Sequence, residues 1–261
     1  MKSFNFKSAT NSKDATKLAS GRATFLAGGM SLLPAMKLRL AGYSDLINIK
    51  KIKSLSGIKV SSKSLRIGAT TTHAEVARSK EVGKSISSLG ILAEGIGDPQ
   101  VRNRGTIGGS IANNDPAADY PSACLALNAI IHTSKRKIAA DKFFKGMFET
   151  DLKKGELIEA VEFEVPEKSA YVKYPNPASR YAVVGVYVSK FKKEVRVAVT
   201  GAGSSVFRSK ELETALTNNF SPSAIDNINV SSKGLNSDIH ASSEYRAHLI
   251  KVMARKAVSS C

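Results

Sequence analysis

Hydrophobic and polar positions near the N-terminus follow the period of a strand in some stretches and that of a helix in others. An apolar run at 24–26 predicts a buried strand, alternate apolar positions over 45–49 predict another, and residues 15–20 are helical in character. Four residues between the two strands are spaced for the buried face of a helix: Leu32, Leu33, Met36 and Leu40. This part of the chain therefore predicts alternating α and β elements.

Strand patterns continue through the rest of the chain. Five further stretches have apolar residues that alternate or run together: 65–69, 129–132, 157–165, 181–191 and 194–200. Apolar residues occupy mostly odd positions in the third stretch, which predicts a half-exposed strand that ends at Pro166. The last two stretches are expected to form an antiparallel pair, with Lys192 and Lys193 at the turn.

Helices are predicted between these strands and at the C-terminus. Thr72 and Glu75 have the spacing of a capping box, so a helix is expected to begin there. Helical periodicity also covers 82–96, 119–127 and 244–258. The last of these carries four residues along one face, which we expect to be core packing: Tyr245, Leu249, Val252 and Met253.

Composition limits the kind of protein this can be. With 261 residues, 42% of them hydrophobic, the chain can form two or three small domains. No apolar run reaches the roughly eighteen residues of a transmembrane helix, and the N-terminus lacks the apolar core of a secretion signal. Cys124 and Cys261 have no metal-site spacing, and no disulfide is expected between them. A cytoplasmic protein without a metal site fits these features best.

The charge is strongly positive, with 39 basic and 22 acidic residues and a formal net charge of +17. The lysines are scattered, without interleaved aromatic residues, and no nucleic-acid motif occurs. A nucleic-acid partner is therefore not expected. A lysine-rich soluble surface and a docking face for an acidic partner both remain open.

Two glycine pairs carry the main chemical signal: Gly28-Gly29, followed by Met30-Ser31, and Gly108-Gly109, followed by Ser110. A glycine pair lets another group approach the backbone and can expose consecutive N–H groups to an anion. Either pair alone fits an ordinary tight turn, and neither has the G-x-G-x-x-G spacing of a Rossmann motif. Together they predict a ligand held at two points, such as a dinucleotide.

The second glycine pair lies in a long stretch, 97–121, that is rich in small, polar and turn-forming residues. We expect a functional loop here, because long irregular loops in compact domains usually have a function. Asp119, near its end, can accept hydrogen bonds from two ribose hydroxyls or can cap the helix that follows, and the two roles are compatible.

The two loops and their flanks resemble the FAD-binding medium subunit of the molybdenum hydroxylases, the xanthine dehydrogenase, carbon monoxide dehydrogenase and aldehyde oxidoreductase group. The resemblance covers nearly the whole chain. It rests on the segments 27–34, 36–39, 102–110, 115–121, 178–184, 201–203 and 238–242. It implies an α+β fold with a two-part FAD-binding region of the vanillyl-alcohol-oxidase (PCMH) type and a small α+β C-terminal domain. The implied units are residues 1–57, 58–166 and 167–261.

The resemblance also implies which residues would contact FAD. The first loop would line the pyrophosphate, the second loop would hold its other side, and Asp119 would hold ribityl or ribose hydroxyls. Ile158 and Lys173 match looser positions near the flavin ring and the adenine end. The full implied set is Ala27, Gly28, Gly29, Met30, Ser31, Leu32, Leu33, Thr106, Ile107, Gly108, Gly109, Ser110, Asp119, Ile158 and Lys173. Met30 departs from the polar residue that is frequent in the family. His73 is expected either to begin a helix or to approach the flavin.

The implied activity is electron transfer in an oxidoreductase complex. The chain has no cysteine quartet for an iron–sulfur cluster and no catalytic side chain is expected in it. Molybdopterin and two iron–sulfur clusters are expected on a large and a small partner subunit, in a dimer of heterotrimers. FAD in this chain would then pass electrons to a terminal acceptor. A stand-alone flavin-dependent oxidoreductase and a basic, non-enzymatic binding module remain as alternatives.

Overall fold

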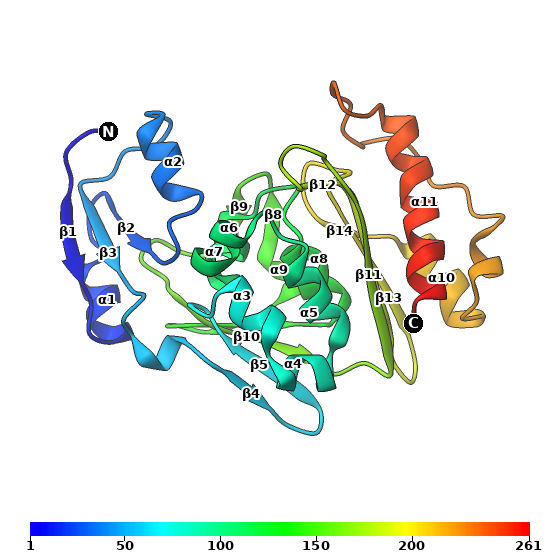
Figure 1. Ribbon diagram of the computed structural model, residues 1–261, viewed down its shortest axis with the longest axis horizontal. Coiled ribbons are helices and arrows are strands. Elements are labelled where there is room, and N and C mark those ends of the chain that lie inside the picture. The colour runs from blue at the N-terminus through cyan, green and yellow to red at the C-terminus, as the bar shows by residue number, and fades with distance from the viewer.

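The computed structural model describes residues 1–261, and its helices and strands form three groups arranged side by side along the long axis (Figure 1). We call them the first, middle and last regions. Each is built on its own sheet, and the sheets extend over residues 5–48, 58–164 and 168–208. The predicted α+β class is confirmed, while the proposed division into units at 57 and 166 stays a prediction.

The first region carries a parallel sheet of three strands in the order β1-β3-β2. Its elements are β1 (Asn5–Ser8), α1 (Ser12–Leu18), β2 (Ala23–Leu26), α2 (Leu32–Lys37), β3 (Asp45–Asn48) and the 3-10 helix η1 (Lys53–Leu55). The predicted alternation of elements is confirmed, but the predicted buried face of α2 is wrong at Leu40. The helix ends at Lys37, so Leu40 lies beyond it with 79% of its surface exposed, whereas Met36 is buried.

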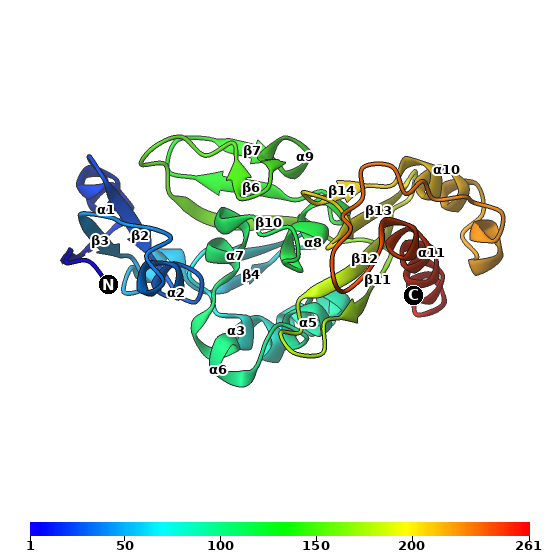
Figure 2. The same cartoon turned by 90° about the horizontal axis from the view of Figure 1, so that it is seen from above.

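The middle region carries an antiparallel sheet in the order β4-β5-β10-β6-β7, with helices packed on it (Figure 2). Its strands are β4 (Ile58–Val60), β5 (Ser64–Gly68), β6 (Ile130–Thr133), β7 (Lys137–Ala139), β8 (Phe144–Gly146), β9 (Glu149–Thr150) and β10 (Ile158–Glu164). Its helices are α3 (His73–Arg78), α4 (Lys80–Ser85), α5 (Ser87–Glu94), α6 (Pro99–Arg104), α7 (Ile107–Asn113), α8 (Tyr120–Ala126) and α9 (Ala140–Phe143). Strands β8 and β9 form a separate hairpin.

Two helical predictions for the middle region are corrected. The predicted helix 82–96 is two helices, because Ile86 leaves the helical conformation (φ −145°, ψ 75°) and is buried in the core. The predicted loop 97–121 contains α6 and α7. Their caps explain the difference: the side chains of Asp98 and Thr106 accept hydrogen bonds from backbone N–H groups in the first turns.

The last region is an antiparallel sheet in the order β11-β12-β13-β14, with one long helix on its outer face (Figure 1). Its elements are β11 (Lys168–Pro175), β12 (Ala182–Lys190), β13 (Val195–Thr200), β14 (Phe207–Arg208), α10 (Lys210–Asn218), the 3-10 helix η2 (Pro222–Ile225) and α11 (Ser243–Ser259). The predicted strand pair and its turn are confirmed. On α11, Leu249 and Met253 are buried as expected, but Tyr245 is 42% exposed and Val252 is only partly buried.

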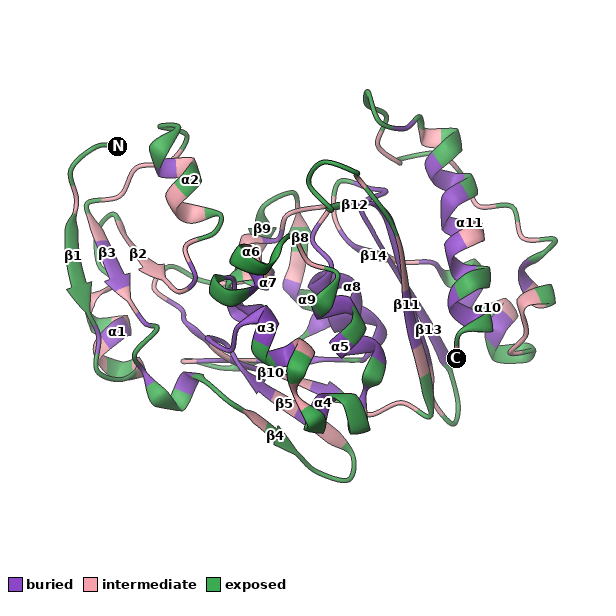
Figure 3. Ribbon diagram, in the orientation of Figure 1, coloured by how far each residue is buried: buried purple, intermediate pink, exposed green.

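The last sheet is covered on both faces. Tyr171, Tyr187 and Ala198 belong to the core of 29 buried residues that it shares with the middle region, while α11 and α10 pack on its other side. Figure 3 accordingly shows β12 and β13 as buried along their length. Burial on both faces explains why these two strands are apolar at nearly every position rather than at alternate ones.

Two features agree with the composition. Cys124 and Cys261 are both free thiols, so no disulfide links them. None of the helices combines the length and the apolar character needed to cross a membrane.

Candidate functional site

A cavity of about 900 Å³ lies where the first and middle regions meet, and a loop of the last region borders it. The first region contributes the end of β2, the loop 27–31 and the start of α2. The middle region contributes segments around α7, Asp119 and 148–158, and the last region contributes residues 179–181. Clefts of this size, lined by apolar side chains with a few polar groups, are typical of cofactor sites.

The loop 27–31 offers a row of unpaired backbone donors to this cavity. The backbone N–H groups of five consecutive residues, Gly28 through Leu32, have no acceptor in the protein, and all five residues line the cavity. Gly29 has a φ of +77°, a left-handed conformation that favours glycine. Consecutive free N–H groups in a concave loop form an anion-binding surface.

Gly28 is required for a different reason. A Cβ at this position would overlap the carbonyl oxygen of Arg104, at the end of α6. The missing side chain therefore lets the first region pack directly against the middle region, and this contact brings the two glycine loops together.

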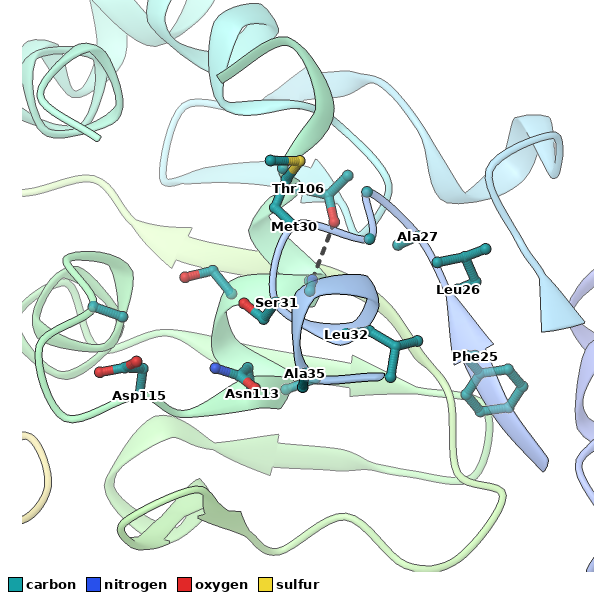
Figure 4. A pocket seen from close by; sticks show the side chains of 18 of the residues that line it. Phe25, Leu26, Ala27, Met30, Ser31, Leu32, Ala35, Thr106, Asn113 and Asp115 are labelled. Atoms are coloured by element: carbon teal, nitrogen blue, oxygen red, sulfur yellow. Dashed lines mark hydrogen bonds between the residues drawn. The ribbon is translucent and has the colours of Figure 1, made fainter. Parts of the chain in front are cut away.

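The second glycine pair does not expose free N–H groups, which corrects the expectation from the sequence. The N–H groups of Ile107 and Gly108 donate to the carbonyls of Thr71 and Ala69, at 3.1 and 2.9 Å. That of Gly109 donates to Oγ1 of Thr106 at 3.1 Å, the dashed bond in Figure 4.

These two glycines instead allow close approach. A Cβ at Gly108 would lie 2.6 Å from the Cβ of Ala69, so this glycine lets α7 pack on the end of β5. A Cβ at Gly109 would meet only Oγ1 of Thr106, at 2.9 Å, and Gly109 is exposed where it lines the cavity. At Gly109 the second loop therefore presents bare backbone to the same cavity that the donors of the first loop line.

Asp119 lies in the cavity wall with its carboxylate already paired. Its Oδ1 lies 2.9 Å from Nζ of Lys173, and it accepts a hydrogen bond from the hydroxyl of Tyr171. Burial raises the pKa of Asp119, while the Lys173 ammonium and the Tyr171 hydroxyl oppose that shift. The side chain makes no hydrogen bond to the first turn of α8, so the expected capping role is wrong: Tyr171 and Lys173 engage the carboxylate instead.

His73 also lies in the cavity wall, as the first residue of α3 after the capping residue Thr72. It is buried, its ring lies 5.3 Å from that of Tyr120, and its Nδ1 has no hydrogen-bond partner. Burial, assisted by the nearby charge of Arg102, lowers the pKa of His73 to about 4. The imidazole is therefore neutral at physiological pH, and its Nδ1 is a buried polar atom without a hydrogen-bond partner in the protein.

Glu156 places a second carboxylate in the cavity wall. Burial alone would raise its pKa, but hydrogen bonds from Arg136 and Thr133 lower it to about 2. This carboxylate is therefore ionised and fully engaged with the protein. No group of three or more potential metal-ligating side chains occurs in the structure.

The structure brings most of the predicted site residues together. Those that line the cavity are Ala27, Gly28, Gly29, Met30, Ser31, Leu32, Thr106, Gly108, Gly109, Ser110, Asp119 and Ile158. Leu33 faces a smaller neighbouring cavity of 240 Å³, Ile107 is buried in the core, and Lys173 lies behind Asp119. The contact of each with a ligand stays a prediction.

Several residues that line the cavity were not among the predicted site residues. They are Phe25, Tyr43, Phe148, Arg180 and Tyr181. Arg180 and Tyr181 belong to a motif of the resemblance, but nothing in their spacing places them beside α7. Phe148 belongs to no motif, and only the hairpin β8–β9 brings it to the cavity.

Comparisons with known proteins agree with the geometry. A sequence model described as the FAD binding domain in molybdopterin dehydrogenase matches residues 2–167. The glyceraldehyde dehydrogenase medium chain of Sulfolobus acidocaldarius is 35% identical over 272 aligned positions, which cover 97% of this chain and 96% of the relative. The carbon monoxide dehydrogenase medium chain of Hydrogenophaga pseudoflava is 36% identical over 200 positions, covering 71% and 69%.

Solved structures show the same fold over the full length. A chain of the reconstituted CO dehydrogenase from Oligotropha carboxidovorans matches with a TM-score of 0.92 and 28% identity, covering 99% of this chain and 97% of that chain. A chain of quinoline 2-oxidoreductase from Pseudomonas putida 86 matches with a TM-score of 0.89 and 26% identity, covering 100% and 98%. The resemblance noted in the sequence is confirmed.

Proposed function

The chain belongs to the family of FAD-binding domains in molybdopterin dehydrogenases, and on this premise we propose that it is the electron-transfer flavoprotein subunit of a molybdenum hydroxylase. In this role it passes electrons from the iron–sulfur clusters of a partner subunit to a terminal acceptor. The full-length similarity to medium chains supports this assignment. Substrate oxidation would then take place on another subunit.

The observation that carries the proposal is the row of unpaired N–H groups from Gly28 to Leu32. A pyrophosphate carries two negative charges side by side, and such a row can bind it without any basic side chain. In the same cavity, the bare backbone at Gly109 would let the phosphates lie against it. The residues present therefore fit FAD.

The remaining wall residues would bind and orient the cofactor rather than perform acid–base chemistry. When bound, FAD supplies the ability to accept electrons singly and release them in pairs, and the protein supplies position and electrostatics. Asp119, held by Tyr171 and Lys173, keeps a carboxylate oriented where a sugar hydroxyl can reach it. His73 would add a neutral ring to the cavity wall beside the cofactor.

The proposed assembly follows the names of the relatives, which are medium chains or subunits of larger complexes. We propose a large molybdopterin-binding partner and a small partner with two iron–sulfur clusters, in a cytoplasmic dimer of heterotrimers. Part of the positive charge would face an acidic surface of a partner, because complementary charge speeds association and fixes orientation. Association that weakens steeply with added salt would support this docking role.

Titration of the purified chain with FAD tests the proposal directly. We expect one FAD to bind per chain. The change in flavin absorbance and fluorescence measures this binding. Gly109→Val should lower the affinity at least about 100-fold, a loss of about 3 kcal/mol, because a branched side chain fills the space where the phosphates approach.

Gly83→Val is the matched control for that titration. Gly83 lies on α4, and a Cβ there would meet nothing within 4 Å, so FAD affinity should stay unchanged. A chain that never takes up stoichiometric FAD would refute the assignment. Equal affinity in the two valine variants would refute the assignment of Gly109 to the phosphate-binding surface.

A further inference from the structure

The hairpin β8–β9 ends in two exposed apolar residues beside the cavity. Met147 and Phe148 form its two-residue turn, with 55% and 58% of their surfaces exposed. Phe148 lines the cavity and Met147 does not. An exposed aromatic residue at a turn contributes little to the core, so its packing gives no reason for its presence.

The backbone at Phe148 makes this residue more unusual. Its φ is +56°, in the left-handed region. When the second central residue of a turn has a positive φ, it is normally glycine or asparagine. A bulky side chain at this position is strained. Strained residues that persist next to a cavity point to a function, because folding alone selects against them.

Asn114 holds this turn in place. Its Nδ2 donates to the carbonyls of Gly146 and Glu149, both at 2.8 Å, and its carbonyl accepts the N–H of Phe148 at 3.1 Å. Asn114 is buried and is itself left-handed, with a φ of 44°, directly after α7. The helix that starts at the second glycine loop therefore ends at a clamp on Phe148.

We propose that Phe148 is a further cofactor-contacting residue, whose ring packs on one of the two flat ring systems of FAD, and that Asn114 is its positioning residue. This inference rests on the proposed function. Aromatic rings pack favourably on other π systems, and FAD offers two of them. The same chain segment goes on to supply Leu152, Leu157 and Ile158 to the cavity wall, so an apolar ring would enter an apolar environment.

The first test compares Phe148→Ala with Met147→Ala in the FAD titration. Removing the stacking ring should raise the Kd for FAD about tenfold. Met147 shares the same turn and exposure but does not line the cavity, so its substitution should leave the Kd within about twofold, which is the usual scatter for uninvolved residues.

Phe148→Asn separates binding from folding. Asparagine suits the left-handed backbone, so the thermal midpoint of the cofactor-free chain should equal or exceed that of the unmutated protein. The same variant should lose FAD affinity as Phe148→Ala does. Titration with FMN and with ADP then shows which ring system Phe148 contacts, since only one of the two should lose affinity.

Asn114→Gly tests the positioning role, because glycine keeps the left-handed backbone and removes only the amide clamp. This variant should lose FAD affinity on its own but add nothing to Phe148→Ala, since the two residues act through one ring. If Phe148→Ala and Phe148→Asn both bind FAD within twofold of the unmutated chain, the inference is wrong. If the unmutated chain does not bind FAD, the proposed function fails and this inference with it.

Discussion

At residue scale, glycines of similar sequence context serve different physical needs. Gly28 is a packing residue, because a Cβ would overlap the Arg104 carbonyl, whereas a Cβ at Gly109 would meet only Oγ1 of Thr106. Gly29 is needed for its left-handed φ of +77°. The same Gly-Gly pattern in the sequence therefore serves a contact between regions at Gly28, a turn at Gly29 and a cavity surface at Gly109.

His73 should make the stability of the protein depend on pH. Its pKa is about 4 in the fold and about 6.5 when unfolded, so the unfolded chain binds the extra proton as the pH falls from 6.5 towards 4. Its contribution to stability is present above pH 6.5 and is lost through that window. Between pH 7 and pH 5 the unmutated protein should lose about 2 kcal/mol more than His73→Gln.

Urea unfolding at the two pH values measures this difference. His240→Gln is the control, because His240 is exposed, and it should lose stability with pH as the unmutated chain does. A pH dependence in His73→Gln as steep as that of the unmutated chain would contradict the buried neutral imidazole.

At element scale, the cavity wall is built from short helices that depend on their caps. Helices α3, α6 and α7 have six or seven residues each, too few to be stable alone. Each has an N-terminal side-chain cap, from Thr72, Asp98 and Thr106 respectively. The caps at Thr72 and Asp98 also fix where α3 and α6 meet the loops of the cavity.

Thr72→Ala should destabilise the protein by about 1–2 kcal/mol. The Thr72 hydroxyl accepts the N–H of Glu75 at 3.2 Å and donates to its carboxylate at 2.7 Å, so alanine removes both bonds. Thr72→Ser keeps the hydroxyl and should stay within about 0.5 kcal/mol of the unmutated chain in urea unfolding. Equal losses in the two variants would show that the methyl group, not the cap, is what matters.

At the scale of the whole molecule, a buried arginine joins the last sheet to the middle region. Arg196 of β13 donates to the carbonyl of Leu125 at 2.9 Å, to Oδ1 of Asn128 at 3.0 Å and to the carboxylate of Asp141 at 2.7 Å. Only 5% of its side chain is exposed. These bonds hold the last sheet against α8 and α9. They therefore also position residues 179–181, which join β11 to β12 and border the cavity.

Arg196→Met should destabilise the protein by about 3 kcal/mol, because it removes the hydrogen bonds of a buried guanidinium and leaves the buried carbonyl of Leu125 unpaired. Arg255→Met is the control, since Arg255 pairs with Asp226 on the exposed surface and its loss should cost less than about 1 kcal/mol. Thermal and urea unfolding of both variants measure the difference. A loss at Arg196 no larger than at Arg255 would rule out a structural role for the buried contact.

Most of the fold could be predicted from local patterns. Strands β2, β3, β5, β12 and β13 follow from runs of apolar residues, and the capping box at Thr72 located α3, because these signals lie within a few residues of one another. The helices α6 and α7 were predicted as loop, since their small and polar residues give no helical period and only their caps and tertiary contacts stabilise them.

By itself, the sequence determined the α+β class, the two glycine loops and, through its motifs, the family. Only the tertiary structure decided which N–H groups stay unpaired, that Asp119 is bound by Tyr171 and Lys173, and that Phe148 reaches the cavity. The physical reason is the distance along the chain over which each interaction acts. Local patterns show how a segment forms its own backbone hydrogen bonds. A free donor or a shared cavity depends on segments that are distant in the chain and meet only when it folds.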